Sequence, residues 1–238
     1  MSSGFPLQDY YSKIYKTYDL VNRLFTFGMD RKWRRQTIGE CLKDNPKQVL
    51  DLCCGTGDLA LGIAAAARQP VRITAYDLNA SMLEVAKTKA KHLGIQTVDF
   101  RQGDAGSMPF ASHEFDRITI GFGFRNLVWQ NPNQSRHLEE MSRVLKPGAR
   151  LLILESAVPE SAFVSFFYRI YLRAILVPLG GILSGDWKAY RYLAGSSSGF
   201  YDFSTLKNMM EPYKLALQSQ KKYLFGSVNL LIATKKGT

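Results

Sequence analysis

The sequence predicts an α/β fold in which helices cover a largely parallel sheet. Apolar runs alternate along residues 48–155 with stretches of helical period, and several of the runs end in an acidic residue or a glycine. This alternation is typical of consecutive strand and helix units, which place their ligands at the carboxyl ends of the strands. With 238 residues, the chain is long enough for one domain of this kind, which we expect over residues 1–238.

The first strand ends in a glycine-centred turn. Val49–Leu52 is apolar around Asp51, Gly55, Thr56 and Gly57 follow, and an alanine-rich helix begins near Asp58. Glycines let backbone N–H groups approach a ligand, and the positive end of the helix favours an anion. The turn therefore predicts a site for a nucleotide-like ligand. It also matches the dinucleotide fingerprint, so this turn alone leaves an NAD-dependent oxidoreductase open.

Two acids follow the next strands. Asp77 ends an expected strand over residues 72–77, twenty residues after Gly57, and suits the two hydroxyls of a ribose. A helix from Asn79 to Gly94 and a strand over 97–101 lead to Asp104 and Ala105. Asp104 is expected to accept the exocyclic amine of adenine or, alternatively, to serve only the turn.

A fourth strand over 114–120 opens into Gly121, Arg125 and Asn126. The next helix stops at 146–148, and a fifth strand covers 151–155. From Asp202 the pattern predicts a last helix and a hairpin-like pair of strands over 214–218 and 227–234. Strands and helices thus alternate to the end of the chain.

Two apolar segments flank this core. Residues 10–35 predict an aromatic amphipathic helix broken at Gly28, which is either a lid over the site or simply packed on the domain. Residues 163–183 predict an apolar helix with a basic margin. Its arginines, Pro178 and two glycines argue against a spanning helix, so we expect membrane contact without crossing, or core packing as the alternative.

The composition of the chain limits the kinds of ligand and partner that we expect. Thirty-one Lys and Arg against twenty Asp and Glu give a net charge of +11, which favours an anionic ligand or an anionic membrane surface. The bases are spread along the chain, so we expect no nucleic acid partner. Cys41, Cys53 and Cys54 form neither a metal-binding pair nor a disulfide framework, and no metal site is expected. The start resembles neither a signal peptide nor a transit peptide, so a cytoplasmic protein is expected.

The motifs Asp51–Gly57, Asp77, Asp104-Ala105, Phe115-Asp116 and 143–148 resemble those of class I S-adenosylmethionine-dependent methyltransferases. More specific motifs lie at Tyr18–Asn22, 33–35, 122–126, 180–186 and 189–193. With these, the chain resembles the menaquinone and ubiquinone C-methyltransferase family over nearly its whole length.

The resemblance implies a seven-stranded Rossmann-like sheet in the order 3-2-1-4-5-7-6, with the seventh strand antiparallel. It implies S-adenosyl-L-methionine as methyl donor, held by Asp51, Gly55, Thr56, Gly57, Asp77, Leu78, Asp104, Ala105 and Gly121. The expected substrate residues are Tyr18, Asn22, Trp129, Asp186 and Tyr190. It also divides the chain into a helical lid (1–40), a donor-binding core (41–158), a substrate cap (159–200) and a closing part (201–238).

The expected reaction is C-methylation of a prenylated or phytylated hydroquinol. Cys54 and Val128-Trp129 depart from the pattern of many family members. The double cysteine, Cys53-Cys54, looks like the cyanobacterial and plastid branch, which methylates demethylphylloquinol. Demethylmenaquinol and a polyprenyl benzoquinol stay open as substrates, as does a homodimer. An inner or photosynthetic membrane would be the place of peripheral attachment.

A ring carbon becomes nucleophilic when the neighbouring hydroxyl ionises. We expect Arg125 to stabilise this phenolate, with Asn126 orienting the oxygen. Arg125 could instead be a structural ion-pair partner. Asp186, Tyr190 and His137 are all candidates for the base, and the sequence favours none of them.

Overall fold

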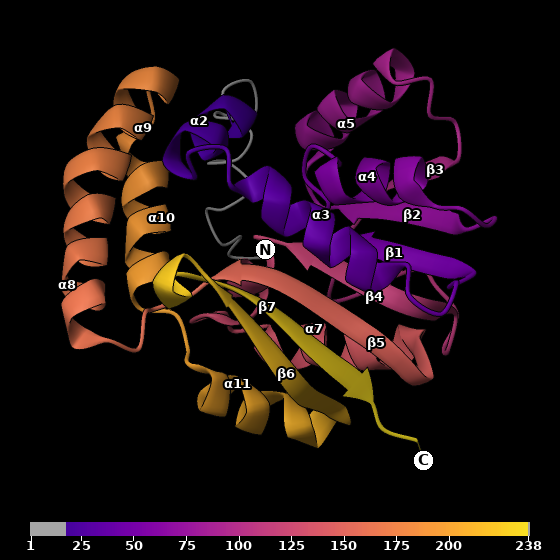
Figure 1. The fold of residues 1–238 in the computed structure, drawn as a ribbon. Helices are drawn as coiled ribbons and strands as arrows, with labels where there is room; N and C mark the ends of the chain where they lie inside the picture. The colour runs from indigo at the N-terminus through magenta and orange to yellow at the C-terminus, as the bar shows by residue number, and fades with distance from the viewer. Residues whose placement is uncertain (1–17, 238) are drawn as a thin grey trace.

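A computed structural model describes residues 18–237 (Figure 1). Its sheet contains β1 Gln48–Leu52, β2 Arg72–Asp77, β3 Val98–Gln102, β4 Phe115–Gly121, β5 Leu145–Ser156, β6 Leu215–Tyr223 and β7 Val228–Lys235. The strand order is β3-β2-β1-β4-β5-β7-β6, and β7 runs antiparallel to β5 and β6. The predicted order and the antiparallel seventh strand are both confirmed.

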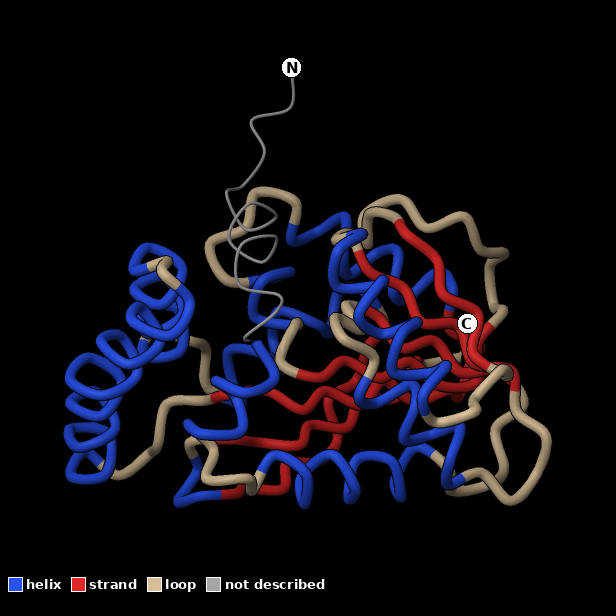
Figure 2. Tube along the Cα trace, turned by 90° about the horizontal axis from the view of Figure 1, so that it is seen from above, coloured by secondary structure: helices blue, strands red, loops and turns tan. Residues whose placement is uncertain are grey.

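Helices cover both faces of the sheet (Figures 1 and 2). They are α2 Tyr18–Phe25, α3 Asp30–Cys41, α4 Asp58–Ala66, α5 Ala80–His92, α6 Phe124–Val128, α7 Gln134–Val144, α8 Ala162–Tyr171, α9 Val177–Ser184, α10 Trp187–Ser198 and α11 Phe203–Met210. The break between α2 and α3 includes Gly28, as predicted, with φ 72°. Tyr11, Ile14 and Tyr15, which the predicted amphipathic helix would place on one face, lie outside the described residues.

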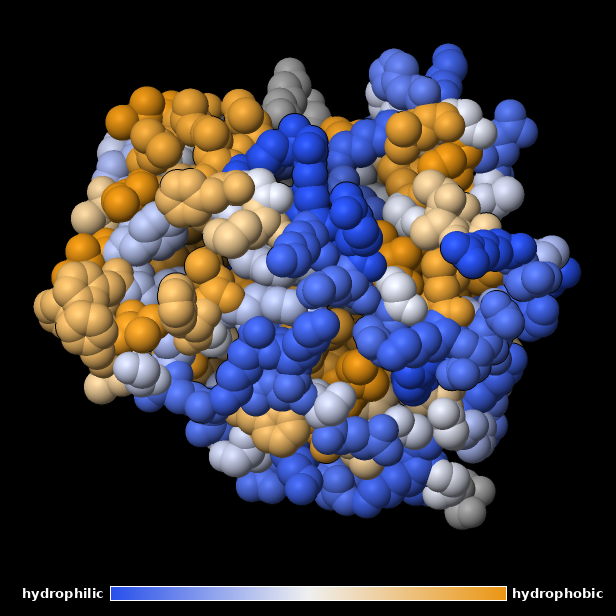
Figure 3. Space-filling view, in the orientation of Figure 1, coloured by the Kyte–Doolittle hydropathy of each residue, from blue (hydrophilic) through white to orange (hydrophobic). Residues whose placement is uncertain are grey.

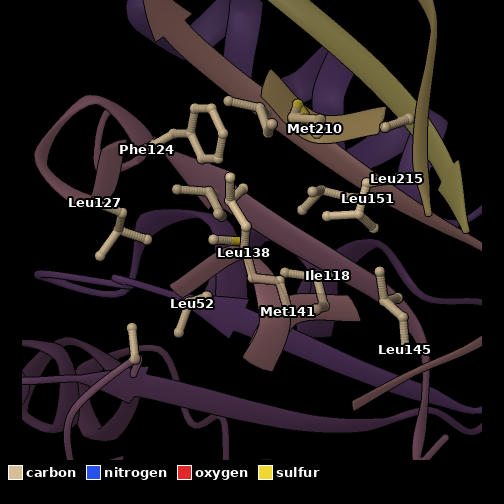
Figure 4. Close-up of a cluster of buried hydrophobic side chains, with 14 of the residues drawn as sticks. Leu52, Ile118, Phe124, Leu127, Leu138, Met141, Leu145, Leu151, Met210 and Leu215 are labelled. Carbon is tan, nitrogen blue, oxygen red and sulfur yellow. The ribbon is translucent and has the colours of Figure 1, made fainter. Parts of the chain in front are cut away.

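Two apolar cores hold these layers together. On one face, α7 and α11 pack on the sheet through Leu138, Met141 and Met210, which meet Ile118 and Leu151 (Figure 4). On the other face, α3 and α4 pack through Trp33, Cys41, Ala60 and Ile63. The central strands are buried on both sides because helices cover both, which explains their continuous apolar sequence.

A third cluster joins α2 to the helices α8–α10. Val21 and Phe25 of α2 meet Leu172, Leu176 and Tyr190. These helices form a separate layer beside the sheet (Figures 1 and 2). The cluster combines residues from two segments that lie far apart in the sequence. It therefore brings the predicted lid and the predicted cap together.

The helical segment after Pro159 is more continuous than its sequence suggests. A π-helical turn, Leu172–Leu176, joins α8 to α9, and the resulting helix Ala162–Ser184 has 23 residues, long and apolar enough to cross a membrane by length and composition. Pro178 follows closely on the π-helical turn, where the hydrogen-bond pattern of an α-helix is already interrupted. Gly180 and Gly181 leave room for the rings of Tyr190 and Trp187. Pro178 and the two glycines therefore do not break the helix, and membrane contact without crossing stays a prediction.

One boundary also differs from prediction. Residues 146–148, predicted to stop a helix, belong to β5, whose pairing with β4 is irregular there. Gly148 has φ 77°, so the chain turns inside the strand rather than before it.

Candidate active site

The turn between β1 and α4 has the geometry that its glycines predict. Gly55 and Gly57 have φ 53° and 80°, and Gly57 caps the amino end of α4. A Cβ atom on Gly55 would meet open space, whereas one on Gly57 would lie 2.9 Å from the Ala86 Cβ. Gly55 therefore faces open space, and Gly57 allows α4 to pack against α5.

Asp51 lies beneath this turn. Its carboxylate accepts the Ala60 N–H at 3.0 Å and the Thr119 hydroxyl at 2.8 Å. It is only 1% exposed, and burial raises the pKa of this carboxyl to about 7. Asp51 thus ties the first turn of α4 to β4, and its contact with a ligand stays a prediction.

Asp77 lies beside the turn at the end of β2. One carboxylate oxygen accepts the Gly55 N–H and the other accepts the Asn79 N–H, both at 2.8 Å. Burial raises the pKa of this carboxyl. The structure therefore brings Asp77 and Gly55 together, as a shared ribose-binding site would require.

The other residues that are predicted to bind the methyl donor lie along the same edge of the sheet. Leu78 is exposed after β2, Asp104 is exposed after β3 with its carboxylate 2.8 Å from the Gly106 N–H, and Ala105 is buried. Gly121 ends β4, where a Cβ would lie 2.8 Å from Leu59. Parallel strands bring these positions to one edge because their carboxyl ends align.

A polar network connects α2 to residues 55–57, where the methyl donor is predicted to bind; this turn is called the donor turn below. The Thr56 hydroxyl donates to Asp19 at 2.7 Å, and the Lys89 ammonium lies 2.6 Å from Asp19 and 2.7 Å from Asp58. The pKa of Asp58 is lowered: burial alone would raise it, but the charges of Arg34 and Lys89 outweigh burial. Sequence reasoning named the 18–22 motif but gave Asp19 and Lys89 no role, since α2 and α5 are distant in sequence.

A mostly apolar cavity of about 340 Å³ lies between α2, α3, α8 and the adjoining ends of β5 and β7. Asn22, predicted as a substrate residue, lines it. Its apolar walls include Phe25, Trp33, Phe122, Phe167, Tyr171 and Leu176. Phe225, which is exposed and has φ 55°, also borders the cavity. The sequence did not predict this residue, because the spacing of apolar residues indicates helices and strands but not a turn of this kind.

Arg125 and Asn126 occupy α6, next to this cavity. Arg125 lines it but is only 2% exposed, and its guanidinium donates to Glu155 at 2.8 Å and to the Ser196 hydroxyl at 2.9 Å. The ion pair considered as an alternative is therefore present. Asn126 donates its N–H to the Gly123 carbonyl at 3.2 Å. Neither arrangement tests a contact with substrate, so the catalytic role stays a prediction.

Three further predicted substrate residues, Trp129, Asp186 and Tyr190, are not among the described residues that line the cavity. The Trp129 indole donates to the Gly199 carbonyl at 3.0 Å. Asp186 caps α10 by accepting the N–H groups of residues 188 and 189 at 3.0 Å. Tyr190 is buried against Gly180. Tyr18 begins α2.

His137, considered as a base, also lies away from the cavity lining. Its Nδ1 is 2.8 Å from the Leu127 carbonyl oxygen. Within residues 18–237, no group of three or more His, Cys, Asp and Glu side chains is placed to hold a metal ion.

Comparison with known proteins identifies the family. The model of the ubiE/COQ5 methyltransferase family matches residues 3–235. The chain belongs to this family. It is 41% identical to a demethylmenaquinone methyltransferase of Thermus thermophilus over 84% of this chain and 88% of the relative. It is 37% identical to a ubiquinone/menaquinone biosynthesis C-methyltransferase of Pseudoalteromonas translucida over 85% of this chain and 79% of the relative.

Solved structures agree in fold. The chain is similar to the YcgJ protein of Bacillus subtilis, with TM-score 0.59 and 19% identity over 85% of this chain and 99% of that protein. A SAM-dependent methyltransferase of Aquifex aeolicus gives TM-score 0.57 and 18% identity over 79% and 82% of the two chains. The predicted family and fold are confirmed, and the chain is an S-adenosylmethionine-dependent methyltransferase rather than an oxidoreductase.

The described residues fit this methyl donor. A side chain at position 55 would project into the open space in front of Gly55, and the carboxylate of Asp77 accepts the N–H of the same residue. Asp104 follows at the neighbouring strand end, where an acid can accept the amine of adenine. The positive end of α4 points its backbone N–H groups at the same turn.

Proposed function

We propose that this methyltransferase methylates a ring carbon of a prenylated naphthohydroquinol, demethylmenaquinol or demethylphylloquinol. The observation that carries the proposal is the mostly apolar cavity of about 340 Å³, whose aromatic walls suit a fused ring. The names of the relatives support the same substrate class. A polyprenyl benzoquinol is the alternative substrate.

The bound donor supplies a methyl group on a sulfonium, and the chain has to align and activate the acceptor. The quinol ring would lie among the aromatic walls, where water is largely excluded. Two cations, Arg34 and Arg125, line the cavity, and a 1,4-quinol has two ring oxygens. We keep Arg125 and Asn126 as residues that face a ring oxygen, with Glu155 holding the guanidinium in place.

The lid and cap roles of residues 1–40 and 159–200 belong to the same proposal. Phe167 both lines the cavity and is 52% exposed, so a prenyl tail can leave the cavity at α8. The tail would then meet an apolar surface formed by Phe163, Phe166, Ile170, Ile175 and Ile182. In Figure 3, orange and tan patches gather on this side of the molecule, with paler polar residues between them.

We propose that this surface docks on an anionic membrane from the cytoplasmic side. One side of the helix packs against α2 and α10 through Leu172 and Leu176, which favours a helix lying in the interface over one that crosses. Exposed Arg169 and Arg173 would meet the headgroups. A single chain supplies both the donor site and the cavity, so the proposal does not require a homodimer.

A reconstituted assay tests this function. The purified protein is given S-adenosylmethionine and, in separate reactions, chemically reduced demethylmenaquinol, demethylphylloquinol and a demethylated polyprenyl benzoquinol. Mass spectrometry should show one added methyl group on a naphthoquinol at a kcat/KM at least about tenfold above that for the benzoquinol. A preference for the benzoquinol would replace the proposed substrate, and no transfer to any quinol would refute the function.

A further inference from the structure

The inner side of α3 brings a carboxylate and a guanidinium into the substrate cavity. Asp30, the first residue of α3, is 7% exposed, and Arg34 follows one helical turn later with its side chain 13% exposed. Both line the cavity of about 340 Å³. Sequence reasoning gave neither residue a role beyond placing Arg34 in a family motif.

The Arg34 Nε–H is buried without a hydrogen-bond acceptor among residues 18–237. Its nearest carboxylate oxygens, on Asp30 and Asp58, lie at 3.7 and 3.6 Å, which supports charge attraction but exceeds hydrogen-bond length. Buried donors are nearly always satisfied, because an unsatisfied one keeps its full desolvation cost. The guanidinium that carries this N–H lines the cavity, so a ligand oxygen placed there can accept one of its N–H groups.

The neighbours of the Arg34 guanidinium belong both to the cavity and to the donor turn. It lies over the Phe122 ring at 5.4 Å, and a Cβ on Gly121 would be 3.2 Å from its Nη1. Asp58, its other neighbour, is the first residue of α4 behind the donor turn. Arg34 therefore lies between the donor turn and the substrate cavity.

We propose that Asp30 and Arg34 bind and deprotonate the ring hydroxyl adjacent to the carbon that receives the methyl group. The inference rests on the proposed quinol substrate and names the base that the sequence left open. The hydroxyl donates to Asp30, while its oxygen accepts an N–H of the Arg34 guanidinium. A guanidinium this close favours the ionised oxygen, and an opposite charge lowers a phenolic pKa of about 10 by about 1–3 units.

The protons and electrons balance as follows. The O–H bond breaks, its electron pair stays on the oxygen, and the proton moves to Asp30. Once the ring carbon carries the new methyl group, its C–H bond breaks, that electron pair restores the aromatic ring, and the proton leaves to solvent. The ring oxygen then takes back the proton held by Asp30, so one proton is released per turnover.

Other charged groups surround this pair. Asp58 and Asp51 lie on the donor side, with Lys89 paired to Asp58. Arg125, which is paired with Glu155, and Tyr168 also line the cavity, and burial raises the pKa of Tyr168 to about 12. Tyr168 therefore stays neutral when a substrate oxygen ionises.

The test uses 4-methoxy-1-naphthol, which keeps one ionisable hydroxyl, bound to the full chain with S-adenosylhomocysteine so that no transfer occurs. Its naphtholate absorbs at longer wavelength than the neutral form, so a pH titration reports ionisation of the bound probe. In the wild type, ionisation should occur about 1–3 pH units lower than in water. Arg34→Gln should abolish most of this shift and weaken binding at neutral pH by about 10- to 150-fold.

Arg35→Gln is the matched control, since it makes the same change at the exposed neighbouring position of α3. It should leave probe binding and ionisation unchanged. Asp30→Asn should lower kcat by about 10²-fold with little change in KM, and its activity should recover in part as rising pH ionises the substrate. If Arg34→Gln does not fold, Arg34→Lys is used instead. It keeps the positive charge but lacks the guanidinium N–H groups, so it should also weaken binding of the probe.

Normal probe ionisation and affinity in a folded Arg34 variant that still binds S-adenosylhomocysteine would overturn the inference. If wild-type protein methylates demethylmenaquinol in that case, the proposed function stands without it. If the wild type neither methylates a quinol nor binds the probe, both fall together.

Discussion

Arg125 shows how one side chain can satisfy two different requirements. It lines the cavity of about 340 Å³, yet Glu155 accepts both its guanidinium N–H at 2.8 Å and its backbone N–H at 3.0 Å. Glu155 is 1% exposed, so loss of Arg125 alone would leave a buried carboxylate without its partner. Any loss of activity in a single variant therefore mixes stability with chemistry.

We predict that Arg125→Ala lowers the free energy of unfolding by about 3–5 kcal/mol, because it breaks a buried pair. Adding Glu155→Gln should recover much of this loss, since the unpaired charge is gone. If Arg125 faces a ring oxygen, the double variant should still turn over about 10²–10³-fold more slowly while its donor affinity changes little. Denaturant unfolding and steady-state kinetics measure the two effects. Full turnover in the double variant would leave Arg125 a purely structural role.

At the scale of elements, the helix Ala162–Ser184 has two unlike sides. Leu172 and Leu176 are buried against α2 and α10, whereas Phe163, Phe166 and Ile182 are at least 60% exposed. Large apolar surfaces of this kind mark sites of contact with a protein or a membrane. The basic margin of the same helix favours the membrane.

We predict that changing both Phe166 and Phe167 to Ser reduces association with anionic liposomes, because each buried aromatic side chain contributes about 1.5–3 kcal/mol. The variant should also lose more activity on a long-tailed quinol than on one without a tail. Liposome sedimentation and paired kinetics measure these changes. Leu93→Ser, which removes another exposed apolar side chain, from the end of α5, is the control and should have neither effect. Equal losses on both substrates would indicate core damage instead.

For the whole molecule, the buried carboxyl of Asp51 lowers the stability of the fold by an amount that depends on pH. Burial raises the pKa of Asp51 from 3.8 to about 7 in the fold. Between these values the folded chain holds a proton that the unfolded chain has lost. Its stability therefore falls as pH rises through this window, and the full cost is present above the folded pKa.

Asp51→Asn should remove this dependence, because an amide does not titrate. From about pH 5 to about pH 8, the free energy of unfolding of the wild type should fall by roughly 2–3 kcal/mol relative to that of the variant. Denaturant titrations of both proteins at the two pH values measure the difference, and comparison with the variant cancels the other titrating groups. Parallel pH profiles would show that Asp51 does not titrate in this range.

The sequence by itself determined the elements and the donor turn. Strand and helix periods, Gly55, Gly57 and the acid Asp77 are local patterns, and alignment of parallel strand ends then places their residues at one edge of the sheet. The strand order followed from the family resemblance, since short patterns specify an element but not its neighbour in a sheet.

Only the tertiary structure decided how distant elements meet. Asp19 joins Lys89 across 70 residues, Arg125 pairs with Glu155 across 30, and Trp129 binds the Gly199 carbonyl away from the cavity. The free Nε–H of Arg34 depends on α3, α4 and β4 packing together. Such pairings arise when whole helix faces bury their apolar surface, so no local pattern records which polar groups become neighbours.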